Sequence, residues 1–138
     1  MNPLVTRTNV EVRYFKDETD NEYHRLDGPA ALRKCNGHIY WCWHLNDKPH
    51  RDDKPACLEM GGLNWYRHGE LHRTDGPATI EHNGKVVYAI NGVRMSLQEF
   101  KRHHLFVHLF DYKEPTIDSI IDEYNKWRDV DYSHEFAK

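Results

Sequence analysis

The sequence contains three copies of one short motif, and this repetition limits what the chain can fold into. The copies begin at His24, His50 and His72 and read HRLDGPAAL, HRDDKPACL and HRTDGPATI. After each copy comes a turn-forming dipeptide, namely Asn36-Gly37, Gly61-Gly62 and Asn83-Gly84. Such dipeptides between apolar-rich runs indicate hairpins, because type I′ turns need positive φ at both central positions. The pattern therefore predicts three consecutive β-hairpins.

Strand alternation in these hairpins places equivalent motif positions on one face. With two-residue loops, the facing pairs are Leu32 with Trp41, Leu58 with Trp65, and Ile80 with Val87. The predicted inward residues are Ala30, Leu32 and Trp41, then Ala56, Leu58, Met60, Leu63 and Trp65, and finally Ala78, Ile80, Val87 and Ala89. A second turn is expected after each hairpin, at Asn46-Asp47, His68-Gly69 and Asn91-Gly92. Together with a degenerate strand at Tyr14-Phe15, this predicts an antiparallel array of about seven strands.

The periodicity changes at Ser96, where Ser96-Leu97-Gln98-Glu99 forms a capping box. We expect one helix over residues 97–110 and a second from Thr116, with an apolar stripe at three- and four-residue spacing. The fold class is then α+β: an antiparallel β-hairpin array followed by two C-terminal helices. By segment, the expectation is a β-hairpin sheet over 1–95, a helical pair packed on or beside it over 96–128, and a loose polar tail over 129–138.

The repeated motif resembles the MORN-variant repeat, the His-Arg-x-Asp-Gly-Pro-Ala type, of small bacterial, bacteriophage and giant-virus proteins. The resemblance covers about residues 20 to 95, with two good copies and one in which Lys54 replaces glycine. It implies a non-enzymatic scaffold that binds another molecule, and a viral or mobile-element origin. Proteins with true MORN repeats have a different glycine and aromatic pattern, so lipid binding is not implied.

Composition excludes several classes of protein. A chain of 138 residues amounts to about one domain, and its formal charge of -3 includes no run of Lys or Arg, so a nucleic-acid partner is disfavoured. No apolar stretch approaches membrane-spanning length, and the start has no secretory pattern. The three cysteines, at positions 35, 42 and 57, have no Cys-x-x-Cys spacing and are expected to be free thiols. These features favour a cytoplasmic protein, in the host cytoplasm if it is viral.

The most conspicuous polar residues are interpreted as structural. A stacked array needs one joint per unit, whereas an active site seldom needs three copies of itself. We therefore expect a turn-capping Asp, and an Arg or His that contacts the neighbouring unit. The nine predicted joint residues are His24, Arg25, Asp27, His50, Arg51, Asp53, His72, Arg73 and Asp75.

Evidence for catalysis or a bound metal is sparse in the sequence. His104 and His108 stand at i, i+4 spacing on the first predicted helix, but no Glu follows His104 and spacing supplies no third ligand. They are weak metal candidates, and a metal-dependent enzyme is the least favoured function. No nucleophile with an ordered partner and no phosphate-binding loop is apparent. We expect no catalytic residue and no cofactor.

Aromatic and arginine residues on the outer face suggest a binding surface, because this composition is typical of protein-binding hot spots. The predicted partner-binding residues are Tyr40, Tyr66, Arg67, Tyr88, Asp118, Asp122 and Glu123. The leading hypothesis is a non-enzymatic protein-binding module, acting as an adaptor or inhibitor, whose acidic helical end complements a basic partner. The alternative is a site that binds a nucleotide-type ligand between aromatic and Arg side chains. Edge strands near Tyr14 or Tyr88, or the helices, could also join two copies in a homodimer.

Overall fold

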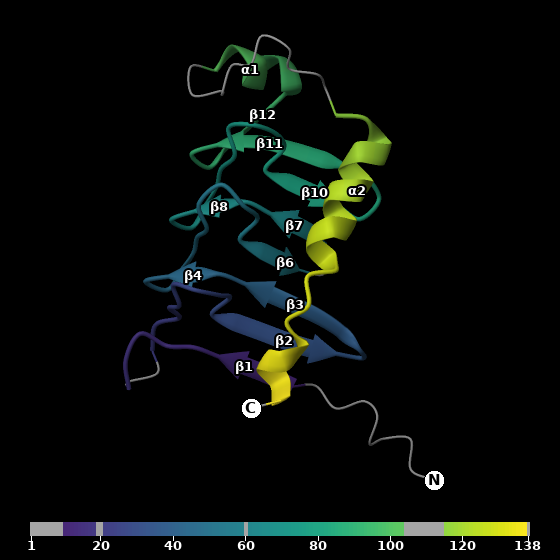
Figure 1. Ribbon diagram of the computed structural model, residues 1–138. Coiled ribbons are helices and arrows are strands. Elements are labelled where there is room, and N and C mark those ends of the chain that lie inside the picture. Colours follow the sequence, from purple (N-terminus) through teal and green to yellow (C-terminus); the bar gives the residue numbers. More distant parts are fainter. Residues whose placement is uncertain (1–9, 19–20, 60, 104–114, 138) are drawn as a thin grey trace.

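The computed structural model describes residues 10–18, 21–59, 61–103 and 115–137 and shows an α+β protein dominated by one antiparallel sheet. Eight strands form this sheet, and strands adjacent in the sheet follow one another in chain order. They stack from β1 at one end of the molecule to β12 at the other (Figure 1). Their bounds are β1 (Val10–Arg13), β2 (Ala31–Cys35), β3 (His38–Cys42), β6 (Cys57–Glu59), β7 (Gly62–Asn64), β10 (Thr79–Glu81), β11 (Val86–Ile90) and β12 (Val93–Met95). Among the described residues, no helix is both long and apolar enough to cross a membrane.

Two small hairpins project from the sheet after β3 and β7. They consist of β4 (His44–Leu45) with β5 (Lys48–Pro49), and β8 (Tyr66–Arg67) with β9 (Glu70–Leu71). Their turns, and the turn between β11 and β12, are the three second turns of the prediction. All six turn residues have positive φ, from 49° at His68 to 86° at Gly69, as type I′ geometry requires. The predicted count of about seven strands was too low, because the described residues form a sheet of eight strands and the two small hairpins add four short ones.

The first hairpin has the predicted register. Asn36 and Gly37 both have positive φ, and Leu32 faces Trp41. In the second hairpin the register differs by two, since Glu59 faces Gly62 and Leu58 faces Leu63 rather than Trp65. A shift of two keeps Leu58 and Leu63 on their predicted face, and Met60 lies outside the described residues.

The third hairpin has a register that differs by one from the prediction. Glu81 N–H bonds to the Lys85 carbonyl, which leaves a loop of three residues ending in Gly84 with φ of 90°. Ile80 therefore faces Val86 instead of Val87. A register shift of one residue moves each side chain of a strand to the other face of the sheet. The prediction that Val87 and Ala89 share a face with Ile80 was therefore wrong.

The core lies on one face of the sheet, which we call the covered face. Its central residues are Leu32, Trp41, Leu58, Leu63 and Ile80, all 2% exposed or less. Helix α2 (Ile117–Arg128) packs on them through Ile120 and Tyr124, as its predicted apolar stripe requires. It runs alongside the stacked strands, and the chain then continues toward β1 (Figure 1).

The first C-terminal helix is shorter than predicted over the residues that can be followed. The capping box at Ser96 and Glu99 is formed as expected, but α1 (Leu97–Arg102) stops where His103 turns extended. Phe100 of α1 packs fully buried against Tyr88 and Ile90 in a second, smaller core cluster. The remainder of the predicted helix, up to residue 110, lies largely outside the described residues.

The described part of the tail, residues 129–137, is folded against the rest of the protein, unlike the loose segment predicted over 129–138. A 3-10 helix, η2 (Ser133–Ala137), lies against β1. Tyr132 and Phe136 pack on the core, and the Tyr132 ring meets Trp41 edge-on at 5.8 Å. These aromatic side chains bury enough apolar area to hold an otherwise polar segment in place.

Candidate functional site

The three motif histidines make equivalent hydrogen bonds to the following unit of the chain. The Nδ1 atoms of His24, His50 and His72 accept the backbone N–H of Asn46, His68 and Asn91, at 3.0, 2.9 and 2.9 Å. Each donor is the first residue of a small type I′ turn. An unprotonated Nδ1 thus joins one unit to the next three times along the stack.

The three motif arginines form a second set of equivalent contacts. Their guanidinium groups stack over Tyr14, Trp43 and Trp65 at 4.0, 4.0 and 4.1 Å from the ring centroids. Each also donates to a proline carbonyl four residues ahead: Arg25 to Pro29 and Arg51 to Pro55 at 3.2 Å, and Arg73 to Pro77 at 3.1 Å. We call this row of Arg25, Arg51 and Arg73 the arginine ladder.

The C-terminal segment contacts every rung of the arginine ladder. Arg25 donates to the buried carboxylate of Glu135 at 2.8 Å, and Glu135 also accepts the Tyr14 hydroxyl. Arg73 donates to both oxygens of Glu123 at 3.2 and 3.3 Å. Although burial opposes it, hydrogen bonds to Glu135 and Asp27 raise the pKa of Arg25 above its usual value. Helix α2 and η2 therefore tie together units far apart in the sheet.

The middle rung differs from the other two. Arg51 lies 5.4 Å from the Trp127 ring, and no ion pair among the described residues joins it to a carboxylate. Burial lowers the pKa of Arg51, and the neighbouring Tyr132 only partly offsets that effect. Asp53, the counterpart of Asp27 and Asp75, adopts a left-handed conformation with φ of 57°.

The difference coincides with Lys54, which stands at the position that is glycine in the other copies. A Cβ atom at Gly28 would lie 2.7 Å from Cζ of Arg25, and one at Gly76 would lie 2.9 Å from Cζ of Arg73. Such distances are too short for nonbonded carbon atoms, so a Cβ here requires the guanidinium group to move. The second copy instead takes a different loop and loses the Arg–Asp pair.

The sheet face opposite the covered face carries the side chains that the helices do not use. We call it the open face, and strand register assigns to it Glu11, Arg13, Ala31, Arg33, Tyr40, Cys42, Cys57, Glu59, Asn64 and Thr79. The core side chains contributed by α1, α2 and η2 pack with covered-face residues. A hollow of about 270 Å³ lies on the open face, bordered by Arg13, Tyr23, Arg33, Tyr40 and Cys42 among others.

Aromatic and arginine groups surround this hollow. The Arg33 guanidinium lies 5.2 Å from the centroid of the Tyr40 ring, and Arg13 pairs with Glu11 beside it. Tyr40 also borders a second hollow of about 610 Å³, which Tyr124 and Arg128 help to line. Of the predicted partner-binding residues, Tyr40 is thus the one that lies at both hollows.

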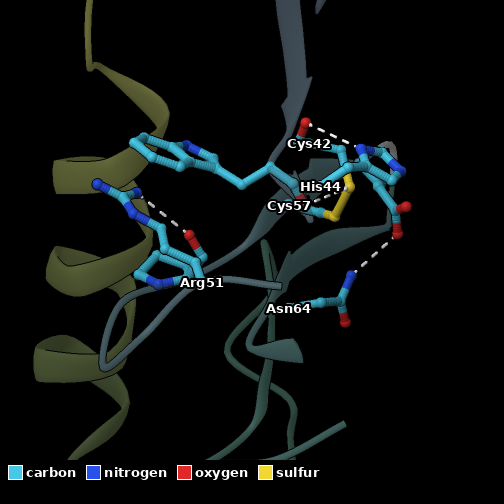
Figure 2. Close-up of a disulfide and its surroundings, with 8 residues drawn as sticks. Cys42, His44, Arg51, Cys57 and Asn64 are labelled. Carbon is cyan, nitrogen blue, oxygen red and sulfur yellow. Dashed lines mark hydrogen bonds between the residues drawn. A yellow bond between two sulfur atoms is a disulfide. The ribbon is translucent and has the colours of Figure 1, made fainter. Parts of the chain in front are cut away.

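Cys42 and Cys57 form a disulfide across the open face, so the prediction that all three cysteines are free thiols was wrong for this pair. Figure 2 shows this disulfide together with the neighbouring side chains of His44 and Asn64. The two residues face each other directly in β3 and β6, with Cα atoms 4.0 Å apart, and Cys35 is free. Burial lowers the pKa of His44, whose Nδ1 lies 3.3 Å from the Cys42 carbonyl oxygen.

The other predicted partner-binding residues are dispersed. Tyr66 is half-buried in β8, where burial raises its pKa, and Arg67 beside it is exposed. Tyr88 is only 7% exposed and packs on Phe100, so it offers a partner little surface, and β12 rather than its own strand forms that edge. Asp118 and Asp122 are exposed on α2, whereas Glu123 turns toward Arg73. The structure does not bring these residues together.

The histidines considered as metal ligands, His104 and His108, lie outside the described residues. Their neighbour His103 ends α1 and is half-buried.

Two features of the site were missed in the sequence. Glu135 sits in a segment without motif or periodicity, and nothing local indicates that it binds Arg25. The cysteine pair did leave a signal: placing the core residue Trp41 opposite Leu58, the first core position of the next hairpin, brings Cys42 and Cys57 face to face.

Comparisons with known proteins give no relative. No family model matches the chain, and neither a curated protein nor a solved structure shows significant similarity.

Proposed function

We propose that this chain is a non-enzymatic protein-binding module that presents its open face to a protein partner. The observation that carries the proposal is the division of labour between the two faces of the sheet. The covered face and the arginine ladder are occupied by α2 and η2, whereas Arg33 and Tyr40 remain at the surface of the other face.

The chemistry of the open face supports a protein partner. Tyr and Arg are among the residues enriched at binding hot spots, since both supply large contact area with a polar end. Three His joints and the contacts of α2 and η2 link the units of the sheet, and a surface held in this way loses less ordering entropy on binding. Resemblance of the motif to MORN-variant repeats favours a viral or mobile-element adaptor or inhibitor that works in the cytoplasm.

The test compares matched arginine substitutions. Tagged wild-type chain, Arg33→Glu, Tyr40→Ala and the control Arg94→Glu are used to isolate partners from the native host, and the protein recovered by the wild type is then purified. We expect Arg33→Glu and Tyr40→Ala each to weaken its direct binding at least tenfold, a change of about 1.4 kcal/mol. Arg94→Glu makes the same charge change in the edge strand β12 and should leave binding unchanged. Equal binding by all variants would exclude the open face.

A second candidate is a nucleotide-type ligand in the hollow of about 270 Å³, where Arg33 and Tyr40 offer a cation and a ring for stacking. A thermal-shift screen separates the two functions. A ligand at 100 times its Kd adds about 2.7 kcal/mol of stability, whereas no nucleotide should shift a protein-binding module.

A further inference from the structure

Three potential metal ligands meet at the centre of the open face. The Sγ atoms of Cys42 and Cys57 and a carboxylate oxygen of Glu59 all lie within 4.8 Å of one another. Cys42 and Cys57 are directly opposed across two strands, and Glu59 is two residues beyond Cys57, so strand alternation directs all three to one face. In the oxidised chain the two sulfurs are bonded to each other, and reduction leaves two thiols beside a carboxylate.

The carboxylate of this cluster is held in place by its neighbours. Asn64 donates from Nδ2 to Oε2 of Glu59 at 3.0 Å, an interaction visible at Asn64 in Figure 2. The Thr79 hydroxyl in turn donates to Oδ1 of Asn64 at 2.8 Å. Such a chain of hydrogen bonds fixes a ligand's orientation, as the outer shell does around metal ions in proteins.

The donor set selects among metals. Two thiolates favour a thiophilic ion, and two sulfurs with one carboxylate oxygen are ligands that zinc accepts. Three protein ligands leave a fourth tetrahedral position for water. Cys42 and Glu59 both border the hollow of about 270 Å³, which gives an ion and a water a path from solvent.

Charge around the cluster is also suitable. Two thiolates and a carboxylate bring three negative charges to a divalent ion, leaving an excess of one. Glu11 lines the same hollow and pairs with Arg13, so Arg33 is the cation there that offsets the excess. Without a neighbouring arginine, the bound ion and its three ligands would keep a net negative charge at a partly buried site, which is unfavourable.

We propose that the reduced chain binds one zinc ion through Cys42 Sγ, Cys57 Sγ and a Glu59 carboxylate oxygen, and that disulfide formation excludes the ion. Reduction by a dithiol breaks the sulfur–sulfur bond: the dithiol gives up two electrons and two protons and becomes a disulfide, and the chain gains two thiols. Zinc binding then releases the two thiol protons to solvent. In a reducing cytoplasm the dithiol form prevails. This site does not depend on the proposed protein-binding function.

Cobalt(II) serves as the spectroscopic probe. Full-length protein is reduced with a phosphine, stripped of metal with a chelator and titrated with cobalt, and an untreated oxidised sample is titrated in parallel. We expect the reduced chain to develop a thiolate-to-cobalt charge-transfer band that saturates at one equivalent and disappears on addition of zinc. The oxidised chain should develop none. A reduced chain without this band would overturn the proposal.

Variants assign the ligands. Cys42→Ser should abolish the band, and Asn64→Ala should weaken zinc binding about 10- to 100-fold through the Glu59 carboxylate. The matched control is Cys35→Ser, which removes the third cysteine and should change nothing. Glu59 is exposed, so Glu59→Gln tests the site in a chain that folds, and we expect at least a tenfold loss of affinity. Unchanged affinity in Glu59→Gln, or a band lost in Cys35→Ser, would overturn the assignment.

Discussion

The outer two copies of the motif and the middle copy share a backbone plan but differ in how they hold an arginine. Arg25 and Arg73 each pair with an aspartate two residues ahead and with a glutamate from the C-terminal segment. Arg51 keeps the aromatic stack and the proline carbonyl but has no carboxylate partner among the described residues. Stacking and the carbonyl bond are therefore the common elements of the motif, and the ion pairs are additions found in the two copies that have glycine.

The comparison also shows what fixes the tail. Glu135 meets the first rung of the arginine ladder and Glu123 meets the third, whereas Trp127 and Tyr132 pass the middle rung as aromatic side chains. The C-terminal segment thus places a glutamate at each arginine that also pairs with an aspartate, and it places aromatic side chains beside Arg51, which has no such pair among the described residues.

Removing a rung should separate the two classes most strongly. Arg25→Ala removes the arginine that bonds the buried carboxylate of Glu135 at 2.8 Å, and we expect a loss of about 3–5 kcal/mol in the free energy of unfolding. Arg51→Ala loses stacking and one hydrogen bond but leaves no buried anion, so about 1–3 kcal/mol is expected. Denaturant unfolding of both variants measures the difference.

A double variant gives the control for this prediction. Adding Glu135→Gln to Arg25→Ala removes the buried charge and should restore part of the lost stability. Equal losses for Arg25→Ala and Arg51→Ala would show that the ion pairs do not distinguish the rungs.

Much of this fold could be predicted because its determinants are local. Positive φ at Asn36-Gly37 and at the three second turns follows from residue type, and these turns set the hairpins. The strand register was harder to predict. The loop that ends at Gly84 has three residues rather than the predicted two, and the additional loop residue places Val87 on the opposite face of the sheet. Local turn chemistry does not distinguish these two closures.

A glycine substitution tests the space that the outer copies need. Gly76→Ala places a Cβ 2.9 Å from Cζ of Arg73, a guanidinium pinned by Asp75, Pro77 and Glu123. We expect a loss of about 1–3 kcal/mol from this overpacking, measured as a shift in denaturant midpoint. In the middle copy, position 54 already carries a Cβ, so Lys54→Ala should change the free energy of unfolding by under about 0.5 kcal/mol. Similar results at the two positions would contradict the steric explanation.

The candidate site was harder to predict than the fold, because its parts come from distant segments. Tyr40 and Arg33 follow from alternation around the first turn, since they face each other in the predicted register. The contacts that the C-terminal segment makes on the covered face do not follow from alternation. Tyr132, Glu135 and Phe136 lie in a polar tail and act through tertiary contacts alone. Tyr88 was misplaced because α1 folds onto its ring, and no pattern in the sheet sequence indicates that contact.

Acidification should weaken the joint of the third copy. His72 accepts the Asn91 N–H at Nδ1, and burial together with the charge of Arg67 lowers its pKa below the usual 6.5. Because the folded-state pKa is lowered, this stabilisation is full above about pH 6.5 and is lost as the pH falls through the folded-state value. We expect about 1 kcal/mol less stability at pH 5 than at pH 7.5 from this bond. His72→Asn, whose amide oxygen accepts without titrating, should reduce the pH dependence, and an unchanged pH profile would exclude the joint as its source.

Converting the middle copy to the outer type is the mildest change and the most direct. Lys54→Gly removes the Cβ at this position, and we expect Asp53 then to approach Arg51 as Asp27 approaches Arg25. The net change in stability should stay within about 0.5 kcal/mol, because an exposed ion pair contributes about 0.2–1 kcal/mol and glycine loses more backbone entropy on folding. A double-mutant cycle that combines Asp53→Asn with Arg51→Met isolates the pair. The coupling free energy between these two substitutions should be absent when residue 54 is lysine and present when it is glycine. If no coupling develops in the glycine background, the loop difference has another origin than Lys54.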